Sequence, residues 1–183
     1  QLMISARELS PERLPEEAQR WVNRKLQFTH GFGVVAAPVT EFTDDGKPNF
    51  VLQDVPPVGD IPITRPEVYY GENTRDYVVV NSSVKEFSYP TETETPVYAQ
   101  YQGNGGVLIN GFFRKLAYAW KFKDINLLIS GEISEGSRIQ YNRNIQDRVN
   151  EIAPFLVLDD DPYVVVVNGE LQWIQDAYTV TDL

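Results

Sequence analysis

The spacing of apolar residues predicts helices in the first and middle parts of the chain. The first helix is marked by residues that recur near a period of 3.6, namely Leu14, Ala18, Trp21, Val22 and Leu26. It should end around residues 29–31, where glycine can adopt the left-handed cap conformation. Residues 103–130 are the most helical region, and Asp124 is placed to cap a short helix that ends at Gly131.

Two apolar stripes indicate which sides of the later helices face a core. The stripe in the central region consists of Ile109, Phe112, Phe113, Leu116 and Trp120. A further helix is expected over residues 137–152, and its stripe consists of Ile139, Ile145, Val149 and Ile152. Asn142 falls on this second stripe, where its side chain would need hydrogen-bond partners.

Strands are predicted on both sides of these helices. The segment "GVVAAPV" is typical of a short buried strand, and "EVYYGE" and "DYVVVNS" are expected to pair with each other. Near the end, "YVVVV" and "LQWIQDAY" flank Asn168-Gly169, the dipeptide favoured in type I′ hairpin turns. We therefore expect an α+β fold, with residues 1–183 as a single domain of short antiparallel strands and hairpins around a central helical block.

Composition narrows the classes of function. The chain has 183 residues and is 42% hydrophobic, which is enough for a core, and its 26 acidic against 16 basic residues give a net charge of −10. This acidic balance opposes non-specific nucleic-acid binding, which depends on Lys and Arg neutralising phosphates. Overall charge disfavours attraction to anionic lipid head groups for the same reason.

Several kinds of site are excluded by residue counts. The chain has no cysteine and one histidine, so disulfides, thiol nucleophiles, cysteine-based zinc sites and multi-histidine metal sites cannot form within it. We predict no metal and no cofactor. No stretch approaches the roughly 20 apolar residues needed to cross a bilayer. The chain starts with Gln1 and shows no signal peptide, so we expect a fragment of a longer protein that does not itself span a membrane.

His30 is the first candidate for catalysis, because it is the only histidine and lies beside glycines. As a general base it would need a nucleophile or an orienting acid, for which Glu67 and Asp176 are the weak candidates. The alternative is a packed histidine at the end of a helix, and we favour it because no recognisable catalytic motif surrounds His30. These observations argue against an enzyme without excluding one.

Ligand binding has its own weak candidates, which combine aromatic rings with guanidinium groups: Arg65, Tyr69, Tyr70, Arg143 and Trp173. They are interpreted either as a binding face or as a buried polar network that fixes the fold. Asp159, Asp160 and Asp161 could ligate calcium, but the run lacks the glycine and distal glutamate of an EF-hand and suits a solvated loop better.

Long segments through nearly the whole chain resemble the uncharacterised bacterial protein family numbered 0182. In chain order they are "WVNRKLQFTHGFGVVAAPV", "DVPP", "TRPEVYYGE", "DYVVVN", "KEF", "GGV", "FFRKLAYAWKF", "DINLLIS", "SRIQYNRNIQDRVNEIAPFL", "DDDPYVVV" and "WIQDAYT". The resemblance implies a longer parent in the cell membrane, with several transmembrane helices and a large extracytoplasmic or periplasmic region that contains this chain. It supplies no activity, cofactor or catalytic residue.

The family pattern differs from this chain at a few positions. Relatives often carry Tyr where this chain has Phe28 and Phe32, and commonly His where it has Asn142. A histidine pair in the family would therefore be incomplete here, which weakens the case for catalysis.

Three functions stay open. The first is an extracytoplasmic domain with a binding or assembly role, whose partner is the remainder of the parent membrane protein or an envelope component. The second is a hydrolase that acts on a cell-envelope substrate with His30 as base. The third is a purely structural unit that packs against a larger ectodomain, which a large exposed apolar patch would support.

Overall fold

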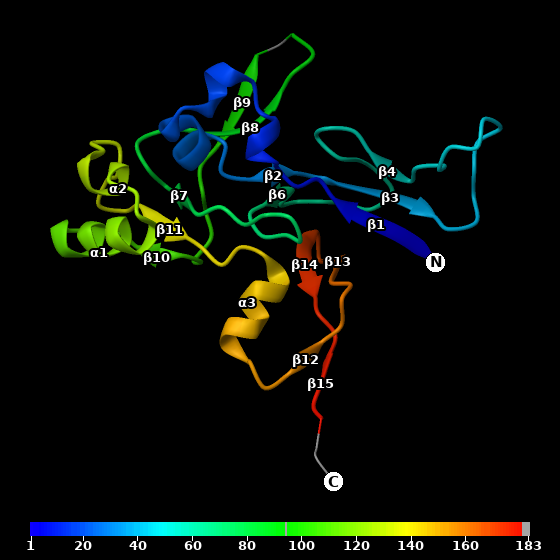
Figure 1. Cartoon of the computed structure of the whole chain (residues 1–183). Helices are drawn as coiled ribbons and strands as arrows, with labels where there is room; N and C mark the ends of the chain where they lie inside the picture. Colours follow the sequence, from blue (N-terminus) through cyan, green and yellow to red (C-terminus); the bar gives the residue numbers. More distant parts are fainter. Residues whose placement is uncertain (94, 181–183) are drawn as a thin grey trace. The chain divides into compact units, whose positions relative to one another are not determined.

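The computed structural model describes residues 1–93 and 95–180, and they fall into two compact units. Unit 1 comprises Gln1–Leu9, His30–Thr74 and the described residues from Asn142 onward, and unit 2 comprises Ser10–Thr29 and the described part of Arg75–Tyr141. Short antiparallel strands and a central pair of helices confirm the α+β prediction (Figure 1). The assignment of residues 1–183 to one extracytoplasmic domain stays a prediction.

Unit 1 is built from short strands and one helix. They are β1 (Leu2–Ala6), β2 (Gly31–Phe32), β3 (Val34–Pro38), β4 (Leu52–Gln53), β5 (Val58–Gly59), β6 (Glu67–Val68), α3 (Ile145–Ile152), β12 (Val157–Leu158), β13 (Tyr163–Val167), β14 (Glu170–Ile174) and β15 (Ala177–Tyr178). One sheet has the order β1-β3-β4-β5, and three antiparallel pairs join β2 to β6, β13 to β14 and β12 to β15. Its core consists of Val34, Ala36, Leu52 and Val164.

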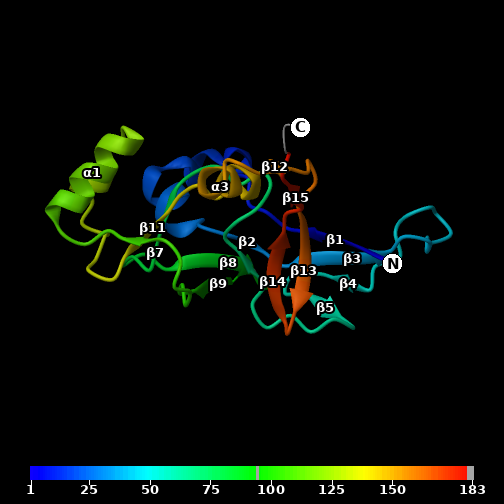
Figure 2. The ribbon, with the colours of Figure 1, turned by 90° about the horizontal axis from the view of Figure 1, so that it is seen from below.

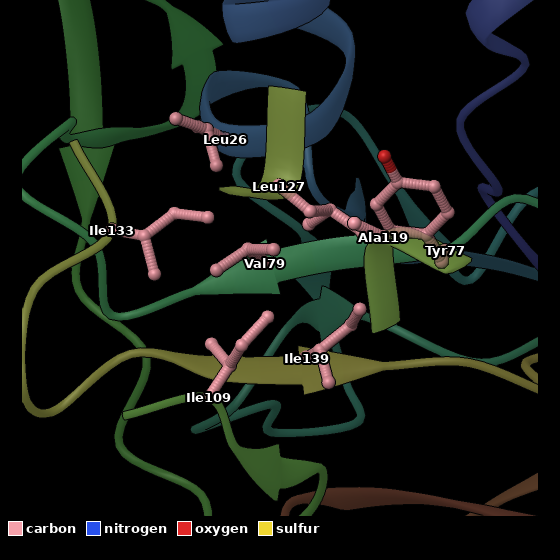
Figure 3. Close-up of a cluster of buried hydrophobic side chains, with 8 residues drawn as sticks. All are labelled: Leu26, Tyr77, Val79, Ile109, Ala119, Leu127, Ile133 and Ile139. Atoms are coloured by element: carbon pink, nitrogen blue, oxygen red, sulfur yellow. The ribbon is translucent and has the colours of Figure 1, made fainter. Parts of the chain in front are cut away.

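Unit 2 places short helices over a three-stranded sheet. Its elements are the 3₁₀ helices η1 (Pro11–Arg13) and η2 (Glu16–Gln19), the π-helix η3 (Asn23–Gln27), β7 (Val78–Val80), β8 (Glu86–Pro90), β9 (Pro96–Ala99), β10 (Val107–Leu108), α1 (Phe112–Phe122), α2 (Asn126–Ile129) and β11 (Arg138–Gln140). The sheet order is β10-β11-β7, and β8 pairs with β9. Its core, shown in Figure 3, consists of Leu26, Tyr77, Val79, Ile109, Ala119, Leu127, Ile133 and Ile139.

Features with a strong local cause agree with the sequence. The chain turns between β13 and β14 at Asn168 and Gly169, whose φ angles of 53° and 81° match the two positive values of a type I′ turn. The "GVVAAPV" segment contains β3, which is mostly buried. Asp124 accepts a hydrogen bond of 3.0 Å from the backbone N–H of Asn126, the first residue of α2.

The predicted first helix is interrupted. The chain forms η1 and η2, and continuous helix begins only after Arg20 and passes into η3. Pro15 and Arg20, on either side of η2, have extended ψ angles of 156° and 148°, and these two residues separate the helical segments. Leu26 is still fully buried, as the apolar pattern predicts.

The predicted helix over residues 137–152 is wrong in its first half. Residues 138–140 form β11, the middle strand between β7 and β10, and α3 begins only at Ile145. Between them Asn142 has a φ of 49°, in the left-handed region that Asn tolerates and helices do not use. The apolar residue Ile139 suits a strand as well as a helix, and pairing with two neighbouring strands decides the outcome.

The strands expected to pair with each other find other partners. β6, in the "EVYYGE" segment, pairs with β2, and β7, in "DYVVVNS", pairs with β11 some 60 residues later. Between β6 and β7 the chain is held by Glu8, whose carboxylate accepts hydrogen bonds from the N–H groups of Glu72 and Asn73 at 2.8 and 2.9 Å. The segment in which a hairpin turn was expected is therefore fixed by a hydrogen-bond acceptor that is distant in sequence, the Glu8 carboxylate.

Candidate interaction surface

His30 is enclosed. Its exposed fraction is 2%, the adjacent Thr29 is fully buried, and its ring lies 4.8 Å from the ring of Tyr69. It directly precedes β2, whose two residues pair with β6. A general base must come within hydrogen-bond reach of a substrate, and this ring presents almost no surface to one. The packing interpretation of His30 is therefore the better supported of the two.

The acids proposed to assist His30 lie in different settings. Glu67 is half-buried in β6 opposite Phe32. Asp176 is exposed between β14 and β15, and its carbonyl accepts a hydrogen bond of 2.9 Å from the backbone of Asp159. Glu67 thus lies within a strand pair, and Asp176 lies at the surface.

Four of the five predicted ligand-binding residues are brought together by hydrogen bonds from side chains to backbone carbonyls. Arg143 is 4% exposed and donates from Nε to the carbonyl of Tyr69 at 2.7 Å. Trp173 donates from Nε1 to the carbonyl of Tyr70 at 3.0 Å, and the guanidinium of Arg148 lies 4.9 Å from the Tyr70 ring centroid. These contacts fix the chain after β6, which favours the structural interpretation of this group.

Arg65, the fifth candidate, stands apart. Its side chain is half-exposed and Nε lies 3.7 Å from the Glu170 carboxylate, which is a surface ion pair of little energetic weight. Asn144, which follows Arg143 in the sequence, donates from its side chain to the carbonyl of Glu72. Its side chain also caps α3 by accepting from the N–H of Asp147 at 2.9 Å. Asn144 lies in a segment that resembles the family, but neither it nor Glu8 was assigned a role from the sequence, although both fix the same loop.

Metal binding finds no support among residues 1–93 and 95–180. Within this part of the chain no three acidic or histidine side chains converge on one point. The predicted loop of three aspartates is exposed, and Asp159 uses a carboxylate oxygen to accept from the N–H of Asp161 at 3.1 Å. No helix in the described residues has the length and apolarity to span a bilayer.

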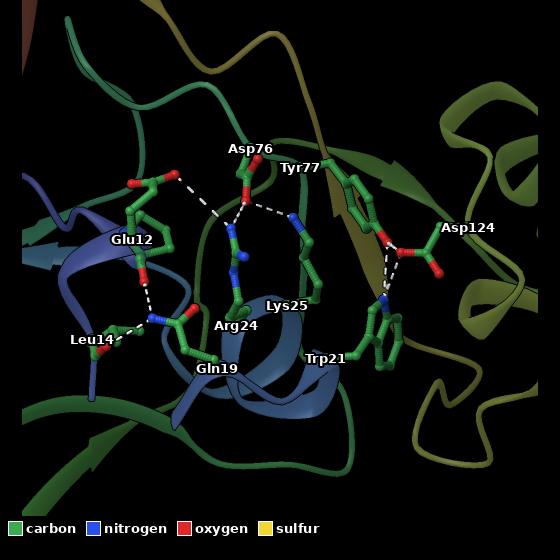
Figure 4. Close-up of polar contacts among 10 residues, drawn as sticks. Glu12, Leu14, Gln19, Trp21, Arg24, Lys25, Asp76, Tyr77 and Asp124 are labelled. Atoms are coloured by element: carbon green, nitrogen blue, oxygen red, sulfur yellow. Dashed lines mark hydrogen bonds and ion pairs between the residues drawn. The ribbon is translucent and has the colours of Figure 1, made fainter. Parts of the chain in front are cut away.

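Unit 2 contains the clearest cluster of ionisable groups, shown in Figure 4. Trp21 Nε1 donates to Oδ2 of Asp124 at 2.8 Å, and the hydroxyl of Tyr77 donates to the same oxygen. Burial raises the pKa of Asp124, but the hydrogen bonds from Tyr77, Asn126 and Trp21 outweigh it and leave this pKa below its usual value. Burial and the bond to Asp124 raise the pKa of Tyr77.

A second acid anchors the π-helix. Asp76 accepts from Arg24 at 2.9 Å and from Lys25 at 2.7 Å, and Arg24 also lies 3.9 Å from Glu12 (Figure 4). Burial raises the pKa of Asp76, and the bonds and charges of these two basic residues lower it further than burial raises it. Both clusters join elements of unit 2, and we assign them to stability.

The inner side of α1 packs on unit 2. Ala119 is 7% exposed, and Tyr118 and Phe122 pack against the core, where the Phe122 ring stacks on Tyr77 at 4.6 Å. Lys115 donates from Nζ to the carbonyl of Ile133 at 2.9 Å. The inner side is therefore apolar and well anchored.

The other side of α1 is also apolar, and it is uncovered. The exposed fractions are 61% for Phe112, 82% for Phe113, 42% for Leu116 and 86% for Trp120. At 100° per residue these four side chains fall within an arc of about 100°. We call this set the outer face of α1. Figure 1 shows α1 beside α2, and Figures 1 and 2 show α1 at the edge of unit 2, with no element of that unit beyond it.

This finding corrects the prediction that the stripe in the central region faces a core. Of its five members only Ile109, which precedes the helix, is buried. The helix has two adjacent apolar sides, and the three residues of the inner side already fill its contact with unit 2. The signal in the sequence was the unusual number of large apolar residues in one short helix, more than one buried side requires.

The segment that carries the outer face is rich in basic residues. Residues 112–123 contain Arg114, Lys115, Lys121 and Lys123 and no acidic residue, although the chain as a whole carries a net charge of −10. An open hollow of about 570 Å³ adjoins the start of α1. It is lined by Asn110, Gly111, Lys115, Ile133, Ser134 and Glu135.

Comparison with known proteins places the chain in a family. The model of the Uncharacterised protein family (UPF0182) matches residues 1–183. The chain belongs to this family. A UPF0182 protein of Cupriavidus necator is 51% identical over 183 residues, which is 99% of this chain, and one of Pelotomaculum thermopropionicum is 49% identical over 184 residues, which is 100% of it.

These UPF0182 relatives are much longer than the chain. The matched region is 20% of each of the two proteins, and the same holds for a UPF0182 protein of Trichodesmium erythraeum that is 46% identical. No solved structure matches the chain. The family resemblance found in the sequence is thus confirmed, and the printed names of these relatives state no activity.

Proposed function

We propose that this chain is an extracytoplasmic binding and assembly domain of a longer bacterial membrane protein, and that the outer face of α1 is its docking surface. The observation that carries the proposal is the exposure of Phe113 and Trp120, at 82% and 86%. Fully burying one such side chain stabilises a protein by about 1.5–3 kcal/mol, so a row of them in water marks a surface that something covers.

Two further observations support an assembly role. The chain matches about a fifth of the length of its relatives, so most of a relative's chain lies outside the matched region. Candidate catalytic residues, by contrast, are enclosed or dispersed, with His30 only 2% exposed. The outer face is thus the feature with the strongest claim to function. The membrane and extracytoplasmic parts of the proposal come from the family resemblance.

Cysteine labelling tests the proposal, because this chain has no cysteine of its own. In the isolated chain, Phe113→Cys and the control Asp44→Cys should react rapidly with a maleimide, since both positions are exposed. The same two positions are then replaced in the full-length Cupriavidus necator relative, freed of its own cysteines and kept in its native membranes. There the position of Phe113 should react at least about tenfold more slowly than the control.

A membrane-impermeant maleimide tests the location. In cells with a permeabilised outer membrane and an intact inner membrane, the Asp44 position should label, and labelling only after lysis would contradict the extracytoplasmic assignment. Equal labelling of both positions in the native full-length protein would show that the outer face stays uncovered and would overturn the docking proposal.

A further inference from the structure

We infer that the outer face of α1 docks onto the surface of an anionic lipid bilayer, with its aromatic side chains in the interfacial region and its basic residues against the head groups. This inference rests on the proposed function, because it names what covers the docking surface. It concerns a helix that lies on a membrane and crosses none of it.

The geometry of α1 matches an interfacial helix. Such helices combine Trp, Phe and Leu on one side with Lys and Arg at the flanks, and lie in the plane of the interface. Phe112, Phe113, Leu116 and Trp120 supply the apolar side. Counting 100° per residue, Lys121 and Arg114 follow about 80–100° beyond its edge. Arg114 donates to the carbonyl of Leu108 at 3.0 Å and the Lys121 ammonium lies 4.2 Å from the Tyr141 ring centroid, so these long side chains would exchange such contacts for head groups.

The attraction of α1 to anionic lipid depends on the charges close to it. The overall charge of −10 disfavours anionic lipids, but at physiological ionic strength a charge acts over only about 8 Å. Residues 112–123 carry four basic side chains and no acidic one, and Asp124 follows directly. Lys115 is engaged on the inner side by the carbonyl of Ile133, which leaves Arg114, Lys121 and Lys123 for the head groups. Each basic residue near an anionic surface strengthens binding by a factor of roughly five. The acidic excess lies wholly in the rest of the chain.

A bilayer also suits the outer face better than a protein partner does. Lys is depleted in the cores of protein interfaces, whereas three of the twelve positions of this segment are Lys. Phe113 and Trp120 retain more than four fifths of their surface, so they project from the helix and do not line a groove. Projecting aromatic rings can enter the interfacial layer without a matching pocket.

Vesicle binding by the purified chain is the direct test. Vesicles of phosphatidylcholine alone are compared with vesicles that contain about a third phosphatidylglycerol, an anionic lipid, in co-sedimentation assays. The chain should bind the anionic vesicles, and the binding should weaken several-fold between about 50 and 500 mM NaCl. Lipids brominated in the acyl chain should quench part of its tryptophan fluorescence, and Trp120→Phe should abolish that quenching while binding persists.

Variants separate the apolar from the basic contribution. Phe113→Ser with Trp120→Ser should lower the partition coefficient at least about tenfold. Lys121→Gln with Lys123→Gln should lower it about 25-fold at low salt and little at high salt. Phe42→Ser removes an aromatic residue of unit 1 that is 66% exposed, and this matched control should bind as the parent does. Circular dichroism confirms that each variant is folded.

Several results would overturn the inference. They are binding no stronger to anionic than to neutral vesicles, unchanged binding by the Phe113/Trp120 variant, or unchanged binding by the Lys121/Lys123 variant at low salt. If the chain does not bind vesicles but the position of Phe113 in the full-length relative still reacts slowly with maleimide, a protein segment is the occupant and the proposed function stands. Dimerisation of the chain that Phe113→Ser with Trp120→Ser abolishes, without vesicle binding, would instead identify a second copy.

Discussion

Removing the carboxylate of Asp124 should destabilise unit 2 more than its half-buried position suggests. Asp124 accepts hydrogen bonds from Trp21 and Tyr77 through one oxygen, and from the backbone and side-chain nitrogens of Asn126 through the other. In Asp124→Ala the donors of Trp21 and Tyr77 lose their acceptor in a partly buried site, and α2 loses its cap.

The size of the effect follows from these contacts. A hydrogen bond to a charged group contributes about 1.5–3 kcal/mol, and loss of a helix cap costs about 1 kcal/mol. Because the site is partly exposed, we take the low end for the two donors and, with the cap, expect about 4 kcal/mol for Asp124→Ala. That would lower the melting temperature by about 8–16 °C. Asp124→Asn keeps an acceptor for Asn126 and should lose about half as much.

Urea unfolding followed by circular dichroism and tryptophan fluorescence measures this change. A double-mutant cycle with Tyr77→Phe isolates the bond between the hydroxyl and the carboxylate, and it should give a coupling of about 1 kcal/mol. The pKa of Asp124 in the folded state is below its ordinary 3.8, so its contribution is present above about pH 4 and is lost as the pH falls through the lowered pKa. Additive effects of the two substitutions would refute the reasoning.

Three further predictions concern other sites. His30→Ala should lower the free energy of unfolding by about 2 kcal/mol, because the ring is buried against Tyr69, and unchanged stability in chemical denaturation would restore the case for catalysis. Gly169→Ala should cost about 1–2 kcal/mol in the same assay, since Gly169 has a φ of 81° and a Cβ there would lie 2.9 Å from Oγ1 of Thr64; no loss would contradict the turn geometry. Asp76 has a lowered pKa, so its pairing with the π-helix should stabilise the fold above about pH 4 and lose that effect as the pH falls further. The free energies of unfolding of Asp76→Asn and the parent, compared across pH, would reveal this loss. An equal difference between them at every pH would count against the prediction.

The sequence determined the features whose causes are local. The hairpin at Asn168-Gly169 forms because that dipeptide tolerates two positive φ angles, and Asp124 caps α2 because its side chain reaches the first N–H of the helix. The α+β class and the family also followed from the residues themselves. Such features depend on neighbours within a few positions, which a sequence displays directly.

Only the tertiary structure decided the features that depend on distant partners. β11 is a strand because β7 and β10 pair with it on both sides, although its apolar spacing also suits a helix. Arg143 and Trp173, two of the residues predicted to bind a ligand, donate to the carbonyls of Tyr69 and Tyr70, which are far from them in sequence. The stripe on α1 was visible in the sequence, but its exposure was not. Periodicity shows that a helix side is apolar, and only packing decides which apolar side is buried and which, like Phe113 and Trp120, is left for a partner.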